Sequence, residues 1–168
     1  MNITPIEETW LKENLEKIDF LKKLEPLQVL RLIDQVTARN IGGGEAVIKQ
    51  GQTGDTFFLL FNGAVTVWIE RNGKRAKIAE LKRGDYFGEI SLLSGMPTSA
   101  EVMAKKPSRV FFLNSKQFIN LVRENPELAN FISAVMEKRL QERKIAAEAI
   151  AKGTPVELSL EIKRFLAG

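Results

Sequence analysis

The sequence predicts a mainly β domain, a sandwich or a closed roll, flanked by helices. In its middle part, short apolar or alternating runs are separated at close intervals by turn residues, which is typical of sandwiches and rolls. Before and after this part, apolar residues recur at three- and four-residue steps, as in helices with one buried face. We assign residues 1–40 to amino-terminal helices, 41–114 to the β region, 115–153 to carboxy-terminal helices and 154–168 to a short helix or tail.

Two helices are expected ahead of the β region. Helical spacing of apolar residues runs from Trp10 to Ile18 and again from Leu27 to Val36. Pro26, between the two runs, suits the first position of a helix, where its missing N–H would have no partner. The pattern predicts two helices joined at residues 23–26.

Two Asn-Gly pairs are the clearest local signals in the β region. Asn62-Gly63 and Asn72-Gly73 each lie between apolar or alternating runs. This dipeptide favours the type I′ hairpin turn, in which both central residues need a positive φ. Both pairs are therefore predicted to be hairpin turns in an antiparallel meander. The other expected strands lie at 46–49, 56–61, 76–81, 100–104 and 108–113.

Helix signals return after the last expected strand. A helix is predicted over 116–123, with Asn114-Ser115 as its cap. Pro126 occupies the first position of a longer helix that is expected to reach Gly153, where glycine suits the end of a helix. The first half of this helix is expected to pack on the β region, and its second half either projects or pairs with another subunit.

The last residues contain one further helix signal. Thr154 to Glu157 has the form of a capping box, in which a Ser or Thr and a Glu three residues later satisfy each other's backbone groups. It predicts a short final helix over 155–166. Such a helix is too short to persist without packing on something else.

Composition excludes several kinds of chemistry. The 168 residues contain no cysteine and no histidine, so disulfides, a thiol nucleophile, a Cys/His zinc site and a histidine base are all excluded. No nucleotide-triphosphate loop or serine-hydrolase motif is present either. We therefore expect no enzyme, no metal and no resident cofactor.

Charge and hydropathy indicate which partners and which cellular location to expect. The net charge is +4, but the basic residues are scattered, which is typical of a solvated surface rather than of nucleic-acid binding. No apolar run is long enough for a membrane span, and the amino terminus is acidic rather than signal-like. We expect a cytoplasmic protein with no membrane contact of its own.

The stretch over 84–104 is the candidate site. Glu89 follows Gly88 there and precedes a short apolar run over 90–93. Glycine allows close approach of the backbone, so a carboxylate and a backbone N–H can meet one small ligand. Residues 89–94 are expected to form a short helical turn with free N–H groups at its start. This arrangement suits a ligand that carries a sugar hydroxyl and a phosphate.

The segments 87–93 and 95–100 resemble the phosphate-binding cassette of the cyclic-nucleotide-binding domain family. The glycine turns at 51–55 and 62–65 are also similar to those of the family. The resemblance implies a double-stranded β-helix, that is, a jelly-roll-like β-roll. It also implies a regulatory module for signal transduction that binds cyclic AMP or cyclic GMP and relays occupancy through its carboxy-terminal helices to an effector domain or partner protein.

The resemblance also implies a role for each cassette residue. Glu89 matches the family acid that bonds the ribose 2′-hydroxyl, Gly88 and Ile90 match backbone contacts, and Ser99 matches a phosphate contact. Thr98 stands where the family has the arginine that pairs with the cyclic phosphate. The predicted ligand site consists of Phe87, Gly88, Glu89, Ile90, Thr98 and Ser99.

Thr98 leaves two functions open. A neutral hydroxyl stands in place of a guanidinium, which carries a positive charge and two donors for the phosphate. This replacement is expected to weaken the binding of a cyclic nucleotide by roughly two to four decades. In the first function, the domain is a cyclic-nucleotide sensor. In the alternative, the pocket is degenerate and the domain serves protein interaction or homodimer formation through the helix over 126–152.

Overall fold

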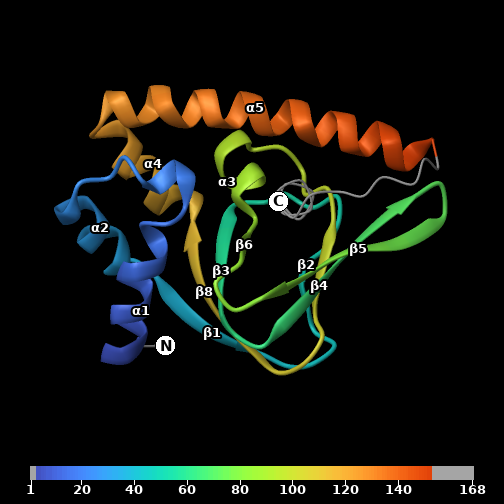
Figure 1. The fold of residues 1–168 in the computed structure, drawn as a ribbon, viewed down its shortest axis with the longest axis horizontal. Coiled ribbons are helices and arrows are strands. Elements are labelled where there is room, and N and C mark those ends of the chain that lie inside the picture. The colour runs from blue at the N-terminus through green and yellow to red at the C-terminus, as the bar shows by residue number, and fades with distance from the viewer. Residues whose placement is uncertain (1–2, 153–168) are drawn as a thin grey trace.

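The structure, a computed structural model, describes residues 3–152. Helices lie at both ends of this part of the chain, and strands lie between them (Figure 1). The helices are α1 (Pro5–Leu15), the 3-10 helix η1 (Asp19–Leu21), α2 (Pro26–Ile33), α3 (Glu89–Ser94), α4 (Ser115–Arg123) and α5 (Pro126–Ala151). The strands are β1 (Thr37–Ile41), β2 (Ala46–Ile48), β3 (Thr56–Asn62), β4 (Ala64–Arg71), β5 (Lys74–Lys82), β6 (Tyr86–Phe87), β7 (Glu101–Ala104) and β8 (Ser108–Asn114).

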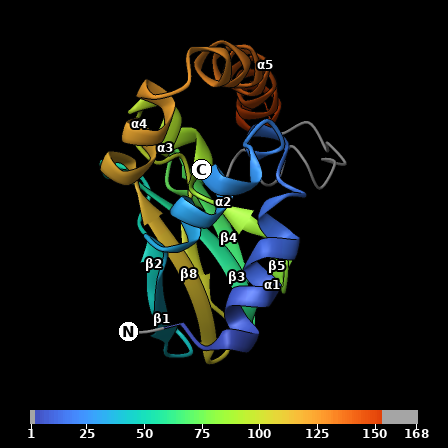
Figure 2. The ribbon, with the colours of Figure 1, turned by 90° about the vertical axis from the view of Figure 1, so that its left-hand side faces the viewer.

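The strands form two antiparallel sheets of four strands each. Their orders are β1-β8-β3-β6 and β2-β7-β4-β5. The chain crosses repeatedly from one sheet to the other, which is how a jelly-roll-like roll is built. The predicted fold class, a mainly β roll with flanking helices, is confirmed (Figures 1 and 2).

The sheet that contains β3 and β8 is buried on both faces. Phe57 and Leu59 of β3 pack in the cluster formed with the helices, whereas Phe58 and Leu60 pack inside the roll. Side chains alternate between the two faces of a strand, so the continuous apolar run at Phe57–Leu60 is what a strand between two cores requires.

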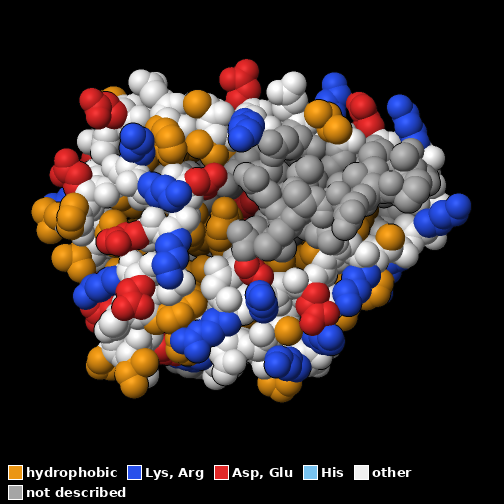
Figure 3. Space-filling model, in the orientation of Figure 1, with side chains coloured by type: hydrophobic (Ala, Val, Ile, Leu, Met, Phe, Trp, Pro, Cys, Tyr) orange, Lys and Arg blue, Asp and Glu red, His pale blue; other side chains and the backbone are white. Residues whose placement is uncertain are grey.

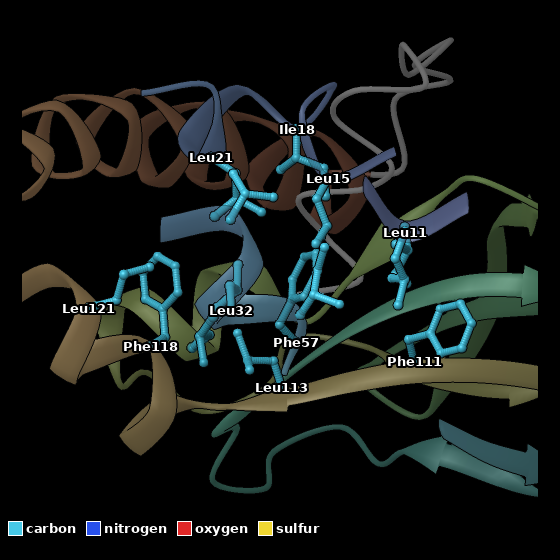
Figure 4. Packing of buried hydrophobic residues seen from close by; sticks show 14 of the residues in the cluster. Leu11, Leu15, Ile18, Leu21, Leu32, Phe57, Phe111, Leu113, Phe118 and Leu121 are labelled. Carbon is cyan, nitrogen blue, oxygen red and sulfur yellow. The ribbon is translucent and has the colours of Figure 1, made fainter. Parts of the chain in front are cut away.

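The helices cover the outer face of this sheet. Figure 4 shows Leu11 and Leu15 of α1, Leu32 of α2 and Phe118 of α4 gathered around the strand residues Phe57, Phe111 and Leu113. From α5, Leu128, Ile132 and Met136 belong to the same cluster. Figure 2 shows α5 lying across one end of the molecule, above α3 and α4.

An ion pair fastens α1 to the roll. Glu7, which is 5% exposed, accepts hydrogen bonds from Arg109 of β8, with Nη2 and Oε2 3.2 Å apart. Arg109 also donates to Asn40 of β1 over 3.0 Å. The hydrogen bond from Arg109 is the main reason why the pKa of Glu7 is lowered from 4.5 to about 2, and bonds to Thr4 add to it.

One of the two predicted hairpins is wrong. Asn72 and Gly73 have φ of 53° and 73° and join the paired strands β4 and β5, as predicted. At the other pair only Gly63 has a positive φ, of 101°. There β3 pairs with β6 and β8, and β4 with β5 and β7, so the chain changes sheets and no meander runs through this turn. Gly63 is needed because a Cβ there would overlap Ser108 of β8.

The helix predictions are confirmed with shifted ends. α4 begins at Ser115 with Asn114 as its cap, and α5 runs from Pro126 to Ala151. The pattern of the second amino-terminal helix extends past its true end at Ile33, and β1 already begins at Thr37, where helix was expected. The helix predicted over 155–166 lies outside the described residues.

The surface carries charges of both signs side by side. On the face in Figure 3, basic and acidic side chains are mixed over the described part of the surface, and neither kind forms a separate patch there. Several of them pair: Arg75 with Glu101, and Lys77 and Lys105 with Glu80. These basic side chains are therefore neutralised locally by acidic partners.

Candidate functional site

Two left-handed glycines define the cassette helix α3. Gly88 precedes it with φ of 87°, and Gly95 ends it with φ of 68°. This conformation costs glycine little and other residues more. A Cβ at Gly88 would also overlap the carbonyl oxygen of Thr56 on β3. The glycine therefore lets α3 begin directly against that strand, as the sequence pattern indicated.

Phe87 and Glu89 are buried on either side of Gly88. The ring of Phe87 is fully buried and stacks on Phe58 of β3, with centroids 5.0 Å apart. Glu89, the first residue of α3, has 0% of its surface exposed. The acid predicted to bind the sugar is thus held at the junction between the cassette and the roll.

Thr98 is bound to the loop that precedes β3. Its hydroxyl donates to the carbonyl oxygen of Lys49 over 2.5 Å and accepts from the N–H of Gln52 over 3.1 Å. The backbone adds two bonds: the N–H of Thr98 donates to Gln52, and the N–H of Gly51 donates to Thr98, each over 2.8 Å. Thr98 is only 5% exposed, so it joins the end of the cassette to residues 49–52.

A cavity of about 110 Å³ lies between this loop and α3. Its polar lining comes from Gln52, Thr53, Asp55, Thr56, Ser91 and Thr98. Its apolar lining comes from Val47, Ile48 and Phe58, and Gly54 and Gly88 complete it. Hydroxyl, amide and carboxylate groups beside an apolar wall form a site that suits a small polar ligand.

The structure brings together only part of the predicted site. Gly88 and Thr98 line the cavity, whereas Phe87 lies behind Phe58, which does line it. Glu89 and Ile90 form the first positions of α3, and Ser99 is half-buried next to Thr98. Sequence reasoning did not identify Gln52, Thr53, Asp55 or Ser91 as site residues, although the glycine turn at 51–55 was a signal for this loop.

The cassette also contacts the carboxy-terminal helix. Leu92 of α3 is buried in the same cluster as Leu128, Ile132 and Met136 of α5, and Figure 1 shows α5 passing directly above α3. A shift of α3 would therefore displace α5 as well, because a packed core resists the opening of voids between its side chains.

A comparison with known domain families decides which family the chain belongs to. The model of the cyclic nucleotide-binding domain matches residues 38–125, which include the whole cassette. The chain belongs to the cyclic nucleotide-binding domain family. The match covers the roll and α4, and it ends where α5 begins.

Curated relatives of this family member include regulatory subunits of cAMP-dependent protein kinase. The chain is 35% identical over 108 residues to the subunit of Emericella nidulans, a match covering 64% of this chain and 26% of that protein. It is 30% identical over 112 residues to the type II subunit of Drosophila melanogaster, covering 66% and 30% respectively. These matches span less than a third of the relatives' own length.

Solved structures of other members have the same fold. The regulatory domain of Toxoplasma gondii PKA with cAMP gives a TM-score of 0.70 at 17% identity, covering 92% of this chain and 56% of that one. The Catabolite Activator Protein of Thermus thermophilus gives 0.63 at 26% identity, covering 80% and 63%. The two likenesses establish the cyclic-nucleotide-binding-domain architecture of the roll and its helices.

Residues 3–152 lack the features of two other kinds of site. No helix within residues 3–152 has the length and apolar character that a membrane crossing needs. Within the same part of the chain, acidic residues do not gather into a group of three that could hold a metal ion.

Proposed function

We propose that this domain is a regulatory sensor that binds a cyclic nucleotide at the cassette and has no catalytic activity of its own. One observation carries the proposal: the family match spans the cassette, whose Gly88-Glu89 step begins a short helix beside a polar cavity. The ligand of the Toxoplasma gondii relative, cAMP, is of the class proposed here.

Each cassette residue has a role in this proposal. Glu89 accepts the ribose 2′-hydroxyl, since a carboxylate is a strong acceptor for a hydroxyl donor. Gly88 and Ile90 offer their backbone, and Ser99 offers its hydroxyl or N–H to the phosphate. Phe87 supports the site from behind by its stacking on Phe58.

Thr98 sets the expected affinity. Its neutral hydroxyl already bonds Lys49 and Gln52, whereas an arginine would supply a charged fork. Charge-assisted hydrogen bonds contribute about 1.5 to 3 kcal/mol each, and about 1.4 kcal/mol is a tenfold change in affinity. Binding is therefore expected to be roughly two to four decades weaker than with the arginine.

Occupancy is relayed through the contact between α3 and α5. Leu92 belongs to the same buried cluster as Leu128 and Ile132 of α5, and α3 contacts α5, so a ligand that binds one position of α3 better than another also shifts α5. The shift is limited by the ligand's differential affinity for the two positions. The output is an effector domain or partner protein that reads the position of α5.

Isothermal titration calorimetry with cyclic AMP and cyclic GMP tests the proposal. The expected result is saturable heat for at least one of them at micromolar to millimolar ligand, and Glu89→Gln is expected to reduce the affinity at least about tenfold. Absence of heat from the folded wild-type chain at millimolar concentrations of both ligands would leave the alternative, an interaction or oligomerisation module.

A further inference from the structure

The cavity beside Thr98 has a lining that is unusual for a phosphate site. Arg and Lys side chains are absent from the described residues that line it. The charged group that it does contain is the carboxylate of Asp55, at the exposed rim. The carboxyl group of Glu89, which is fully buried, belongs to the adjoining first turn of α3. Among the described lining residues, the one charged side chain is therefore acidic.

The hydrogen-bond donors of Thr98 are already in use. Its N–H donates to the Gln52 carbonyl over 2.8 Å, and its O–H donates to the Lys49 carbonyl over 2.5 Å. Ser99, the other predicted phosphate contact, is half-buried and already interacts within the protein. Both donors of Thr98 are therefore directed at carbonyl oxygens of the protein rather than at an anion in the cavity.

Electrostatics make this position unfavourable for added negative charge. Like charges that face each other destabilise a complex, and a neutral donor such as Ser99 offers far less than a charged fork. A phosphate near Asp55 gains no ion pair from the described lining residues to offset its partial loss of water. The charged part of a nucleotide therefore contributes little to binding at this site.

The size and chemistry of the cavity suit a sugar instead. Its volume of about 110 Å³ is about a third of the lower end of the range for pockets that enclose drug-sized ligands. Hydroxyls of Thr53, Thr56 and Ser91 line it together with the Asp55 carboxylate. The hydroxyls can donate to and accept from ligand hydroxyls, and the carboxylate, which already accepts from Thr56 over 2.9 Å, can accept from them. The rest of a nucleoside must lie outside the cavity.

We propose that this site recognises the uncharged, hydroxyl-bearing part of its ligand, and that a ribonucleoside binds to it as tightly as the corresponding cyclic nucleotide. The proposal rests on the function proposed above, because it concerns the same site. It adds the ligand class: neutral nucleosides are ligands in their own right, and the phosphate is not a requirement.

The test compares matched pairs of ligands on the complete chain. Calorimetry gives the dissociation constants of adenosine and cyclic AMP, and of guanosine and cyclic GMP, at low and high ionic strength. We expect each nucleoside to bind within about threefold of its cyclic nucleotide, and we expect added salt not to weaken cyclic-nucleotide binding, because no ion pair to the ligand is screened. A cyclic nucleotide that binds tenfold or more tightly than its nucleoside overturns the inference and leaves the proposed function standing.

A variant in the cavity lining provides a second measurement. Asp55→Asn removes the rim charge, so it is expected to raise the affinity for the cyclic nucleotide by about two- to fivefold relative to the affinity for its nucleoside, as for a like charge near a protein surface. Asp34→Asn, an exposed acid at the end of α2, serves as the matched control and is expected to change neither. Equal effects of Asp55→Asn on both ligand types contradict the inference, and absence of binding by all four ligands rejects the proposed function itself.

Discussion

The hydroxyl of Thr98 is hydrogen-bonded to the carbonyl oxygen of Lys49 across 2.5 Å, which fixes the end of the cassette to the loop ahead of β3. The residue that stands at the expected anion clamp therefore has a structural bond to a distant part of the chain. The N–H of Gln52 adds a second bond to the same hydroxyl. The two bonds join the loop to the cassette.

Thr98→Val should loosen this junction. Valine has a similar shape but no hydroxyl, so the Lys49 carbonyl and the Gln52 N–H lose their side-chain partner. We expect a loss of about 1 to 3 kcal/mol in the free energy of unfolding in urea and faster hydrogen exchange at the Gln52 amide. Thr98→Ser keeps the hydroxyl and is expected to retain most of the stability. An unchanged unfolding midpoint and exchange rate in Thr98→Val would show that the bond contributes nothing.

Gly54→Ala should strain the contact between the same loop and α3. A Cβ at Gly54 would overlap Ser91 and lie 2.9 Å from Cγ2 of Thr98. Overpacking of this kind costs about 1 to 3 kcal/mol, measured by thermal or urea unfolding. Gly43→Ala is the control, because its nearest neighbours would be 3.5 Å away.

A second substitution distinguishes a local clash from a general backbone effect. The double variant Gly54→Ala with Ser91→Gly is expected to lose less free energy of unfolding than the two single variants lose together. The effects of substitutions at neighbouring residues are not additive. Strict additivity would indicate that the loop does not pack on Ser91 in solution.

Glu7 should make stability depend on pH in the acid range. Its folded-state pKa of about 2 lies below its ordinary value of 4.5, chiefly because Arg109 donates to it. The stabilisation is therefore fully present above pH 4.5 and is lost as the pH falls from 4.5 toward 2, by up to about 3 kcal/mol. Glu7→Gln keeps an acceptor for the Thr4 N–H but is expected to flatten this part of the pH profile.

Glu8→Gln provides the matched control for the acid profile. Glu8 lies in the same turn of α1, where it pairs with Lys12 on the surface. Surface pairs contribute about 0 to 1 kcal/mol, so the variant is expected to follow the wild-type profile. Parallel profiles for Glu7→Gln and wild type would show that the Arg109 pair does not stabilise the fold.

The sequence predicted the elements better than their pairing. Asn62-Gly63 and Asn72-Gly73 have the same local signal, but only the second forms a hairpin. The difference arises from Ser108, which is distant in sequence and whose hydroxyl bonds both the N–H and the carbonyl of Ala64. No local pattern contains that contact, so propensity alone could not separate the two turns.

The candidate site shows the same limit. The order of residues around Gly88 was sufficient to predict α3, because both of its ends need left-handed glycines. The hydrogen bonds that the Thr98 hydroxyl makes to the loop ahead of β3 were not predictable, because its partners Lys49 and Gln52 lie more than forty positions away in the sequence. The lining residues Gln52 and Asp55 were recognised only as a turn, because their role depends on the cassette folding against them.

Restoring the missing charge tests the central claim most directly. The claim is that the cassette is a cyclic-nucleotide site that lacks its cationic clamp. Thr98→Arg places a guanidinium beside the cavity, so calorimetry with cyclic AMP is expected to give an affinity about 10² to 10⁴ times higher than that of the wild type. A folded Thr98→Arg variant that binds cyclic AMP no more tightly than the wild type would contradict the account.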